Sequence, residues 1–304
     1  MSRDWSPIIA VTGATGFIGR NLCDHFRRLG WQVRALARDT TAYPFAERGV
    51  EVRACDLPGT LDESALASAR AVVHCAYVTR HRDLDQARRV NDEGTRRVLD
   101  AARAAGVESF VFISSQSAHE EALSYYGRSK FEMEKRLAAG RDLIIRPGLV
   151  LGPGQAGLFQ RMCETVRHAR VVPLFGGGRQ PLQTVHVDDL CSAIASAIDR
   201  RMAGRFTVAE PEPVGMREFL AMLSEKLGSR PVFIPLPMAP ALLAMRTLEA
   251  LRIPFPVSSE NLLGLKQMRA VDTSRDLEAL GVAARPARVS LDAIFSSHAS
   301  RRTG

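Results

Sequence analysis

Short apolar runs alternate along the first half of the chain with longer segments whose apolar residues recur every three or four positions. The runs have the length of buried strands, and the longer segments have the spacing of helices that cover a sheet. The apolar runs lie at residues 8–11, 32–37, 50–57, 71–77, 107–115 and 143–148. This alternation predicts an α/β fold built on a doubly wound parallel sheet.

Helical spacing continues into the second half of the chain. A helix is expected where apolar positions repeat and a capping residue or a glycine closes the segment. Such segments cover residues 22–29, 61–69, 88–105, 124–140, 158–169, 214–227 and 241–251. A further helix ends at Asp199 and begins where Asp188 or Asp189 can cap it. His186 and Asp188 are therefore interpreted as structural residues, and residues 205–209 are expected to form a strand.

Three glycines follow the first apolar run at intervals of three residues. Strand, tight turn and helix in this order form the context in which such glycines bind a dinucleotide. Gly13 allows the sharp turn, Gly16 lets backbone approach a pyrophosphate, and Gly19 lets the helix pack closely on the strand. A turn of purely structural use is the alternative. Residues expected at the cofactor are Gly13, Thr15, Gly16, Phe17, Ile18 and Gly19.

The end of the second strand bears on the choice of cofactor, because this point of a nucleotide-binding unit meets the adenosine ribose. Ala37 stands where an acidic residue would favour NAD, and Arg38 follows it. A guanidinium suits a 2′-phosphate through bidentate contact, which favours NADP(H) over NAD(H). Asp39 one position later keeps NAD(H) open, and the alternative for Arg38 is a solvated or adenine-stacking side chain.

The ends of the third and fourth strands are expected at the same edge of the sheet. Asp56 is placed to bond the adenine amino group, with a turn-forming aspartate as the alternative. Cys75, Ala76 and Tyr77 close the fourth strand and are expected beside the cofactor. His74 lies inside that apolar run and is interpreted as a core histidine.

Several stretches together resemble the extended short-chain dehydrogenase/reductase superfamily, the NAD(P)-dependent epimerase/dehydratase group. They occur in family order: TGATGFIG, the Asp56-Leu57 pair, VVHCAY, VNDEGTRRVLDAARAAGV, FVFISS, YYGRSK and RPGLVLGPG. The resemblance implies a Rossmann domain over residues 1–150, with 180–204 returning to it. It implies a smaller substrate domain over 151–179 and 205–295, and residues 296–304 are expected to be a disordered tail.

Tyr126 and Lys130 lie four residues apart and therefore on one face of a helix. A free phenol titrates near pH ~10, and a neighbouring ammonium brings it toward the working pH of an acid/base catalyst. The resemblance implies that Tyr126 is this catalyst and that Lys130 also holds the nicotinamide ribose. It implies that Ser115 orients the substrate oxygen, with Ser114 and Ser117 as alternatives. It also places Leu57, Ser114 and Pro147 at the cofactor.

The link between the serine and the tyrosine is short, since only residues 116–125 separate them. Family members that act on nucleotide sugars carry a longer segment here, so the short link counts against sugar epimerisation. His119, Glu120 and Glu121 within it are interpreted as a solvated loop. The same feature resembles an atypical branch that includes the NADPH-binding accessory subunit of respiratory complex I. A non-catalytic NADPH-binding subunit is therefore the alternative to an enzyme.

The overall charge of +8 does not indicate a nucleic-acid partner, because arginines are interleaved with acidic residues along the chain. The five cysteines lack metal-ligand spacing, which predicts no metal site and reduced thiols in a cytoplasmic protein. A small hydroxy or keto compound, such as a nucleotide sugar, is the expected partner, and a homodimer is compatible with the sequence. The apolar stretch at 231–257 contains prolines, Arg246 and Glu249 and is not expected to span a membrane. Packing within the small domain is its first interpretation, with a substrate lid, a membrane-surface helix or a partner-binding helix as alternatives.

Overall fold

A computed structural model of the chain describes residues 6–39, 41, 45–79, 84–154, 157–253 and 257–300. Most of the expected tail belongs to a helix, because α11 (Ala287–Ser300) continues through the first part of residues 296–304. Residues 301–304 lie outside the described residues.

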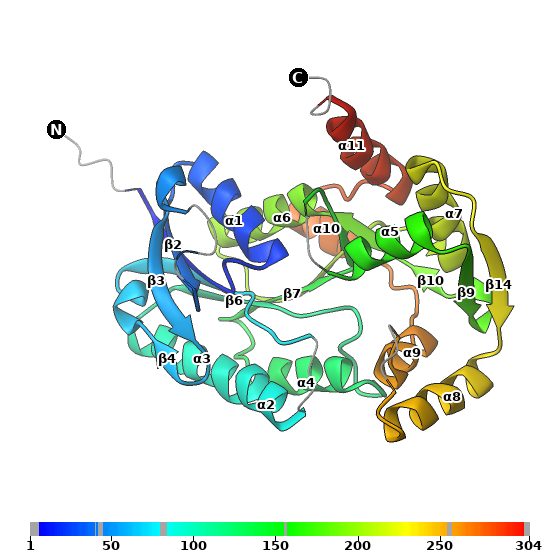
Figure 1. Cartoon of the computed structure of the whole chain (residues 1–304). Helices are drawn as coiled ribbons and strands as arrows, with labels where there is room; N and C mark the ends of the chain where they lie inside the picture. The colour runs from blue at the N-terminus through cyan, green and yellow to red at the C-terminus, as the bar shows by residue number, and fades with distance from the viewer. Residues whose placement is uncertain are drawn as a thin grey trace.

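An eight-stranded sheet forms the centre of the fold (Figure 1), with the strand order β12-β7-β6-β5-β1-β2-β3-β4. Its strands are β1 (Ile8–Thr12), β2 (Gln32–Ala37), β3 (Glu51–Asp56), β4 (Thr60–Leu61), β5 (Ala69–His74), β6 (Ser109–Ile113), β7 (Leu143–Pro147) and β12 (Gly204–Val208). All neighbours are parallel except β3 and β4. The expected doubly wound Rossmann-type fold is confirmed. Its winding reverses between the adjacent strands β1 and β5, which is where ligands bind in such sheets.

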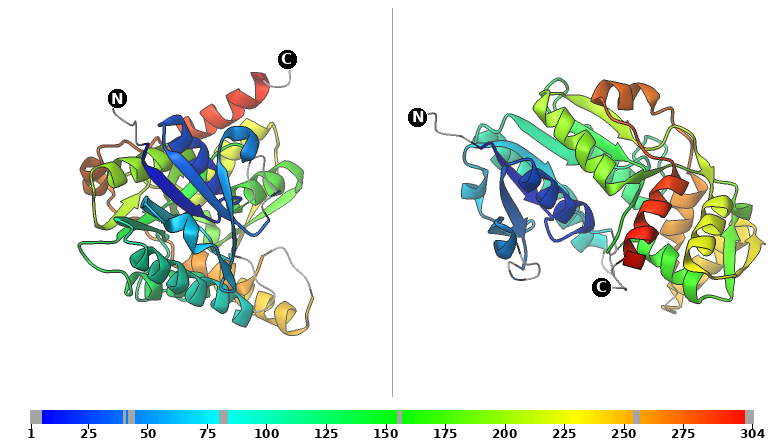
Figure 2. Two further views of the ribbon diagram at one scale, coloured as in Figure 1. Left: turned by 90° about the vertical axis from the view of Figure 1, so that its left-hand side faces the viewer. Right: turned by 90° about the horizontal axis from the view of Figure 1, so that it is seen from above.

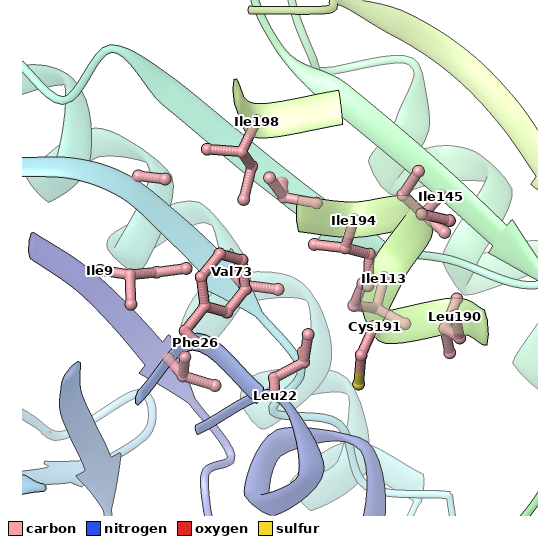
Figure 3. Packing of buried hydrophobic residues seen from close by; sticks show 14 of the residues in the cluster. Ile9, Leu22, Phe26, Val73, Ile113, Ile145, Leu190, Cys191, Ile194 and Ile198 are labelled. Atoms are coloured by element: carbon pink, nitrogen blue, oxygen red, sulfur yellow. The ribbon is translucent and has the colours of Figure 1, made fainter. Parts of the chain in front are cut away.

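Helices cover both faces of this sheet. On one face, α1 (Phe17–Arg28) and α6 (Val187–Asp199) pack Leu22, Phe26 and Ile194 against Val73 and other strand residues (Figure 3). On the other face, α3 (Gly94–Ala104) and α4 (Tyr125–Glu134) contribute to a second apolar layer. The sheet is thus buried on both sides, as the continuous apolar runs of its strands require.

The expectation of a helix at residues 61–69 is wrong. The chain forms β4 and then a short 3-10 helix over Glu63–Leu66. The Asp62 carboxylate accepts bonds from the Ser64 backbone and hydroxyl, and Ser68 adopts a positive φ of 58°. These local bonds favour a tight turn over a regular helix.

The helix expected at residues 88–105 is interrupted. It consists of α2 (Leu84–Arg88), a π-helical turn over Arg89–Glu93, and α3. The Asn91 amide in this turn bonds both the N–H and the carbonyl of Val78, at 2.7 and 3.1 Å. The turn therefore holds the segment that follows β5.

Helix α4 ends at Glu134, before the expected limit at residue 140. Beyond it, the Asp142 carboxylate accepts a bond from the Ala138 N–H at 2.6 Å and pairs with Arg103. These contacts replace the helical hydrogen bonds of the last expected turn and lead the chain into β7.

A second group of elements lies beside the large sheet (Figure 2) and has its own apolar core. It contains the strands β8 (Leu149–Leu151), β9 (Val171–Phe175), β10 (Pro181–Leu182), β13 (Val214–Gly215) and β14 (Val232–Leu236). Its helices are α5 (Leu158–His168), α7 (Met216–Leu227), α8 (Met238–Ala250), α9 (Ser259–Lys266) and α11. Strand β11 (Thr184–His186) pairs with β8, but its Val185 packs in the core of the large sheet.

The boundary expected at residue 205 needs correction, because β12 pairs with β7 in the large sheet. Helix α10 (Ser274–Leu280) also packs on β12 and α6, and its Asp276 accepts a bond from the Thr207 N–H at 2.7 Å. The last third of the chain thus completes the edge of the first domain as well as building the second. None of the helices in the described ranges combines the length and apolarity of a bilayer-spanning segment.

Candidate active site

The glycine turn after β1 packs directly against the chain that leaves β5. Gly13 has a φ of +62°, and a Cβ there would lie 2.7 Å from the Ala76 nitrogen. A Cβ on Gly19 would collide with the Gly13 carbonyl. Both positions therefore require glycine, for the turn and for the close approach of α1.

The start of α1 is suited to hold phosphates. Its N-cap, Gly16, supplies no side-chain hydrogen bond, so the first N–H groups of the helix have no side-chain partner at the cap. Thr15 and Gly16 are exposed at this point. A helix N-terminus of this kind carries positive potential and free donors, which fits the pyrophosphate of a dinucleotide.

The sheet brings most of the expected cofactor residues to one edge, the carboxyl ends of its parallel strands. They occupy the ends of β1, β2, β3, β5, β6 and β7, and they comprise the Gly13–Gly19 turn, Arg38, Asp56, Cys75, Ala76, Tyr77, Ser114, Ser115 and Pro147. Arg38 and Asp56 are exposed. One oxygen of the Asp39 carboxylate accepts bonds from the Thr41 N–H and hydroxyl, at 2.8 and 2.7 Å.

Two of the residues expected at the cofactor, Leu57 and Ser114, turn their side chains into the protein. Leu57 is buried in the apolar layer under α3, where it packs against Gly94. The Ser114 hydroxyl donates to the buried carboxylate of Glu134 at 2.5 Å. For both residues, only the backbone is left to contact a cofactor. The sequence indicates where a strand ends but not the direction of each side chain.

Helix α4 positions the expected catalytic pair. Ser124 caps it by accepting a bond from the Gly127 N–H at 3.2 Å, and Tyr126 and Lys130 follow on one face. Burial raises the pKa of the Tyr126 phenol, and a hydrogen bond with Ser115 acts in the opposite direction. The phenol is therefore held in its neutral form with the Ser115 hydroxyl beside it.

Lys130 is buried, and its ammonium contacts a backbone carbonyl and two aromatic rings. Only 3 % of it is exposed, and its Nζ donates to the Ile113 carbonyl at 2.6 Å. The Nζ also lies 4.0 Å from the Tyr77 ring centre and 4.5 Å from that of Phe112. Burial lowers the pKa of Lys130 from 10.5 to about 7. The expectation that this ammonium lowers the pKa of Tyr126 is thus not met, because burial of the phenol dominates.

A chain of hydroxyl groups that the sequence did not indicate supports Tyr77. Its phenol donates to the Ser129 hydroxyl at 3.0 Å, and Ser129 donates to the Asp92 carboxylate at 3.0 Å. The Tyr77 ring meets the Tyr126 ring edge-on, with centres 5.3 Å apart. Tyr77 therefore contacts both Tyr126, in a perpendicular ring pair, and Lys130, over the face of its ring.

The C-terminal end of α4 is anchored by the buried carboxylate of Glu134, a residue that the sequence did not single out. Arg146 binds Glu134 with two bonds, at 2.8 and 2.6 Å, and Arg205 approaches it at 3.1 Å. Tyr126, Lys130 and Glu134 follow one another at intervals of four. That spacing was the available signal, since it places all three on the same helix face.

Two histidines have structural partners. His74 is buried between Thr12 and Thr95, at 2.8 and 2.9 Å, and burial lowers its pKa to about 3. His186, not Asp188 or Asp189, caps α6, because its Nδ1 accepts a bond from the Asp188 N–H. Asp189 instead binds Arg285.

His119 differs from the solvated loop residue that was expected. It is buried in the link between Ser115 and Tyr126, and its Nδ1 has no hydrogen-bond partner among the residues that the structure describes. Burial lowers its pKa, as do the charges of Arg269 and Arg146. Glu120 and Glu121 are exposed, as expected.

Together these residues form a site that can hold a dinucleotide across the β1–β5 edge and transfer a proton at Tyr126. No group of three or more histidine, cysteine or acidic side chains in the described ranges is arranged to hold a metal ion. All five cysteines are free thiols, and burial raises the pKa of Cys75 to about 12.

Comparisons with known proteins agree with this geometry. The ceramide reductase of Caulobacter vibrioides is 33 % identical over 247 residues, which cover 78 % of this chain and 76 % of that protein. A mitochondrial NADH dehydrogenase [ubiquinone] 1 alpha subcomplex subunit 9 of Arabidopsis thaliana is 26 % identical over 286 residues, covering 88 % and 70 %. The structure of MoeE5 in complex with UDP-glucose and NAD superimposes with a TM-score of 0.73 at 24 % identity, covering 97 % and 99 %, and shows the same fold.

The family model described as "NAD dependent epimerase/dehydratase family" matches residues 9–209. This range includes the glycine turn, Ser115, Tyr126 and Lys130, and it extends through β12. The chain therefore belongs to the NAD-dependent epimerase/dehydratase family, whose members are oxidoreductases and epimerases that depend on a nicotinamide dinucleotide.

Proposed function

We propose that this protein is an NADP(H)-dependent oxidoreductase that acts at a carbinol or carbonyl carbon, with Tyr126 as the acid/base. The arrangement of Tyr126 beside Ser115, at the edge where β1 and β5 meet, carries this proposal. A bound nicotinamide cofactor would supply or accept the hydride.

Three residues have distinct tasks in the reducing direction: Tyr126, Ser115 and Lys130. Tyr126, held neutral by burial, donates its phenolic proton to the oxygen that gains negative charge as the carbonyl is reduced. The Ser115 hydroxyl bonds the same oxygen and orients it toward the phenol. Lys130 binds the nicotinamide ribose when its Nζ leaves the Ile113 carbonyl. In the oxidising direction Tyr126 accepts the proton.

NADP(H) is the proposed cofactor because of the charge at the end of β2. Arg38 is exposed there, and the adjacent Asp39 already holds Thr41 with one carboxylate oxygen. A free guanidinium favours a 2′-phosphate, whereas an acidic side chain directed at the ribose hydroxyls would favour NAD(H).

A ketone is a better candidate substrate than a nucleotide sugar. The ten residues 116–125 leave little chain to build the wall of a sugar site, and the buried His119 occupies part of them. The ceramide reductase at 33 % identity also supports a reductase, and by its name that relative acts on a ceramide.

The test is NADPH consumption with a panel of ketones, including lipid ketones, and with nucleotide sugars. We expect turnover with a ketone and none with the sugars. Epimerisation of a sugar without net consumption of cofactor would contradict the proposal.

The similarity to the complex I subunit favours one second candidate, a subunit that binds NADPH without turnover. In that case the wild-type protein would bind NADPH tightly and reduce nothing in the panel. Tight binding combined with turnover excludes this candidate.

A further inference from the structure

An exposed apolar surface runs along the outer side of the second domain. It begins on the two-stranded ribbon of β9 and β14, where Val171 and Val232 are paired across the strands and are 49 % and 61 % exposed. Ile234 and Leu236 follow at alternate positions of β14 and are also exposed. Residues at alternate positions share one face of a strand, so these side chains form a continuous apolar strip.

The surface continues onto α8, which follows β14 directly (Figure 1). This helix buries only Met245 completely, whereas Leu243 and Leu251 are 68 % and 65 % exposed, and Ile253 beyond it is exposed too. Packing within the domain, the first interpretation of this stretch, therefore does not account for its apolar residues. We define the β14–α8 face by Val171, Val232, Ile234, Leu236, Leu243, Leu251 and Ile253.

Most of the charged side chains that adjoin this face along the chain are cationic. Arg170 and Arg230 flank the paired valines, and Arg246 and Arg252 lie on or just after α8; all four are exposed. The single acidic residue between positions 228 and 253 is Glu249, and its carboxylate is engaged by the N–H and hydroxyl of Ser259.

A groove between α8 and α9 adds to this character. It encloses about 280 Å³ and is lined by Met238, Ala239, Leu242, Leu243, Arg246 and Lys266. Apolar side chains thus make up most of its lining, and an arginine and a lysine add positive charge to it. Such a groove suits an acyl chain attached to an anionic group.

We propose that the β14–α8 face binds the surface of a lipid bilayer that contains anionic lipids. Apolar side chains rimmed by Arg and Lys are the features that hold a protein in the interface, through buried apolar area and attraction to anionic headgroups. A second copy of the chain fits this face less well, because a two-fold contact would bring its cations together.

The same face is connected to the catalytic helix through α9. The Glu260 carboxylate accepts a bond from the Tyr125 N–H at 2.5 Å, at the start of α4. Gln267 binds both Leu123 and Glu121 in the Ser115–Tyr126 link. Helix α9, which packs on α8, thus joins the β14–α8 face to the start of α4 and to the Ser115–Tyr126 link.

The test is co-sedimentation of the full chain with phosphatidylcholine vesicles prepared with and without phosphatidylglycerol. We expect binding to the anionic vesicles alone, weakening as salt is added. The double variant R246Q/R252Q should bind about 25-fold more weakly, since each cation near an anionic surface contributes about fivefold. The variant L243D/L251D should lose binding.

Val289→Asp is the matched control, because Val289 is also about half exposed but lies on α11, outside this face. It should bind as the wild type does, and all variants should keep the wild-type melting temperature. Equal binding to both kinds of vesicle, no binding, or an equal loss in the control would overturn the proposal. So would a wild-type oligomer that L243D/L251D converts to monomers, because the face would then be a subunit interface.

Discussion

The Lys130 Nζ lies 4.0 Å above the centre of the Tyr77 ring while it donates to the Ile113 carbonyl. Lys130 is thus almost completely buried between the face of the Tyr77 ring and the carboxyl end of β6. The Tyr77 ring also packs perpendicular to the Tyr126 ring, with the ring centres 5.3 Å apart. Tyr77 therefore preorganises both Tyr126 and Lys130. The burial of Lys130 also affects the stability of the folded chain.

We expect Lys130→Met to stabilise the protein at neutral pH. Lys130 has a pKa of about 7 in the folded chain, against ~10.4 for an unfolded lysine. Between these values the unfolded chain binds more protons, so the wild type gains stability as pH rises, whereas the variant lacks this gain. The advantage of the variant should be largest below pH 7 and vanish toward pH ~10.

Urea unfolding across this pH range measures the effect, and Lys135→Met, an exposed lysine just after α4, is the control. A Lys130→Met variant that is less stable than the wild type at every pH would show that the ring and carbonyl contacts outweigh the cost of burial.

Tyr126→Phe should lower kcat by about 10²–10⁴-fold and leave NADPH affinity unchanged, because it removes only the proton donor. Steady-state kinetics and fluorescence titration of NADPH measure the two effects. The adjacent Tyr125→Phe is the control, since Tyr125 lies on another side of α4. Equal losses in both variants would point to damage of the helix instead.

The pH dependence of the reduction provides a further check. Burial raises the pKa of Tyr126, so the proton donor should remain available at neutral pH and be lost only in the alkaline range. The ketone-reduction rate of the wild type should therefore fall as pH rises through that pKa. A fall near neutral pH would indicate a phenol with a lowered pKa and contradict the burial argument.

Arg38→Ala should weaken NADPH binding by roughly 10–100-fold, the range of a lost charge-assisted phosphate contact, with little change for NADH. Isothermal titration with both cofactors tests this. Arg27→Ala, an exposed arginine on α1, is the control. Equal losses for the two cofactors would remove Arg38 from the 2′-phosphate site.

Gly13→Ala should destabilise the fold far more than Gly30→Ala. Both glycines have positive φ, at +62° and +80°, so both substitutions incur the left-handed penalty of about 1 kcal/mol. Only the Cβ at Gly13 meets other atoms, those of Cys75 and Ala76. Urea midpoints of the two variants isolate this crowding, and equal midpoints would contradict it.

Glu134→Gln should cost about 3 kcal/mol, because it leaves the mostly buried Arg146 without its counter-charge. Arg205, whose side chain is about half exposed, adds little to this cost. Glu132→Gln, which affects an exposed pair with Lys135 on the same helix, should change stability by less than ~1 kcal/mol. Chemical unfolding of both variants provides the comparison. A small effect at Glu134 would mean that the helix does not depend on this anchor.

Much of this molecule follows from local patterns in the chain. The apolar runs became β1, β2, β3, β5, β6 and β7, and the intervals between Gly13, Gly16 and Gly19 matched the turn that packs on Ala76. These features can be predicted from the sequence because strand and helix periodicity, and the need for glycine at a left-handed turn, depend on neighbouring residues alone.

What only the tertiary structure decided is which distant groups meet. Lys130 binds Ile113 and Tyr77 instead of Tyr126, Glu134 gathers Arg146 and Arg205, and β12 returns to the large sheet. No periodicity in the sequence predicts such pairs, because the partners and the charge state of a buried side chain depend on every segment that packs against it. The sequence alone determined which residues stand at the carboxyl ends of the parallel strands, while packing determined how their side chains are directed and charged.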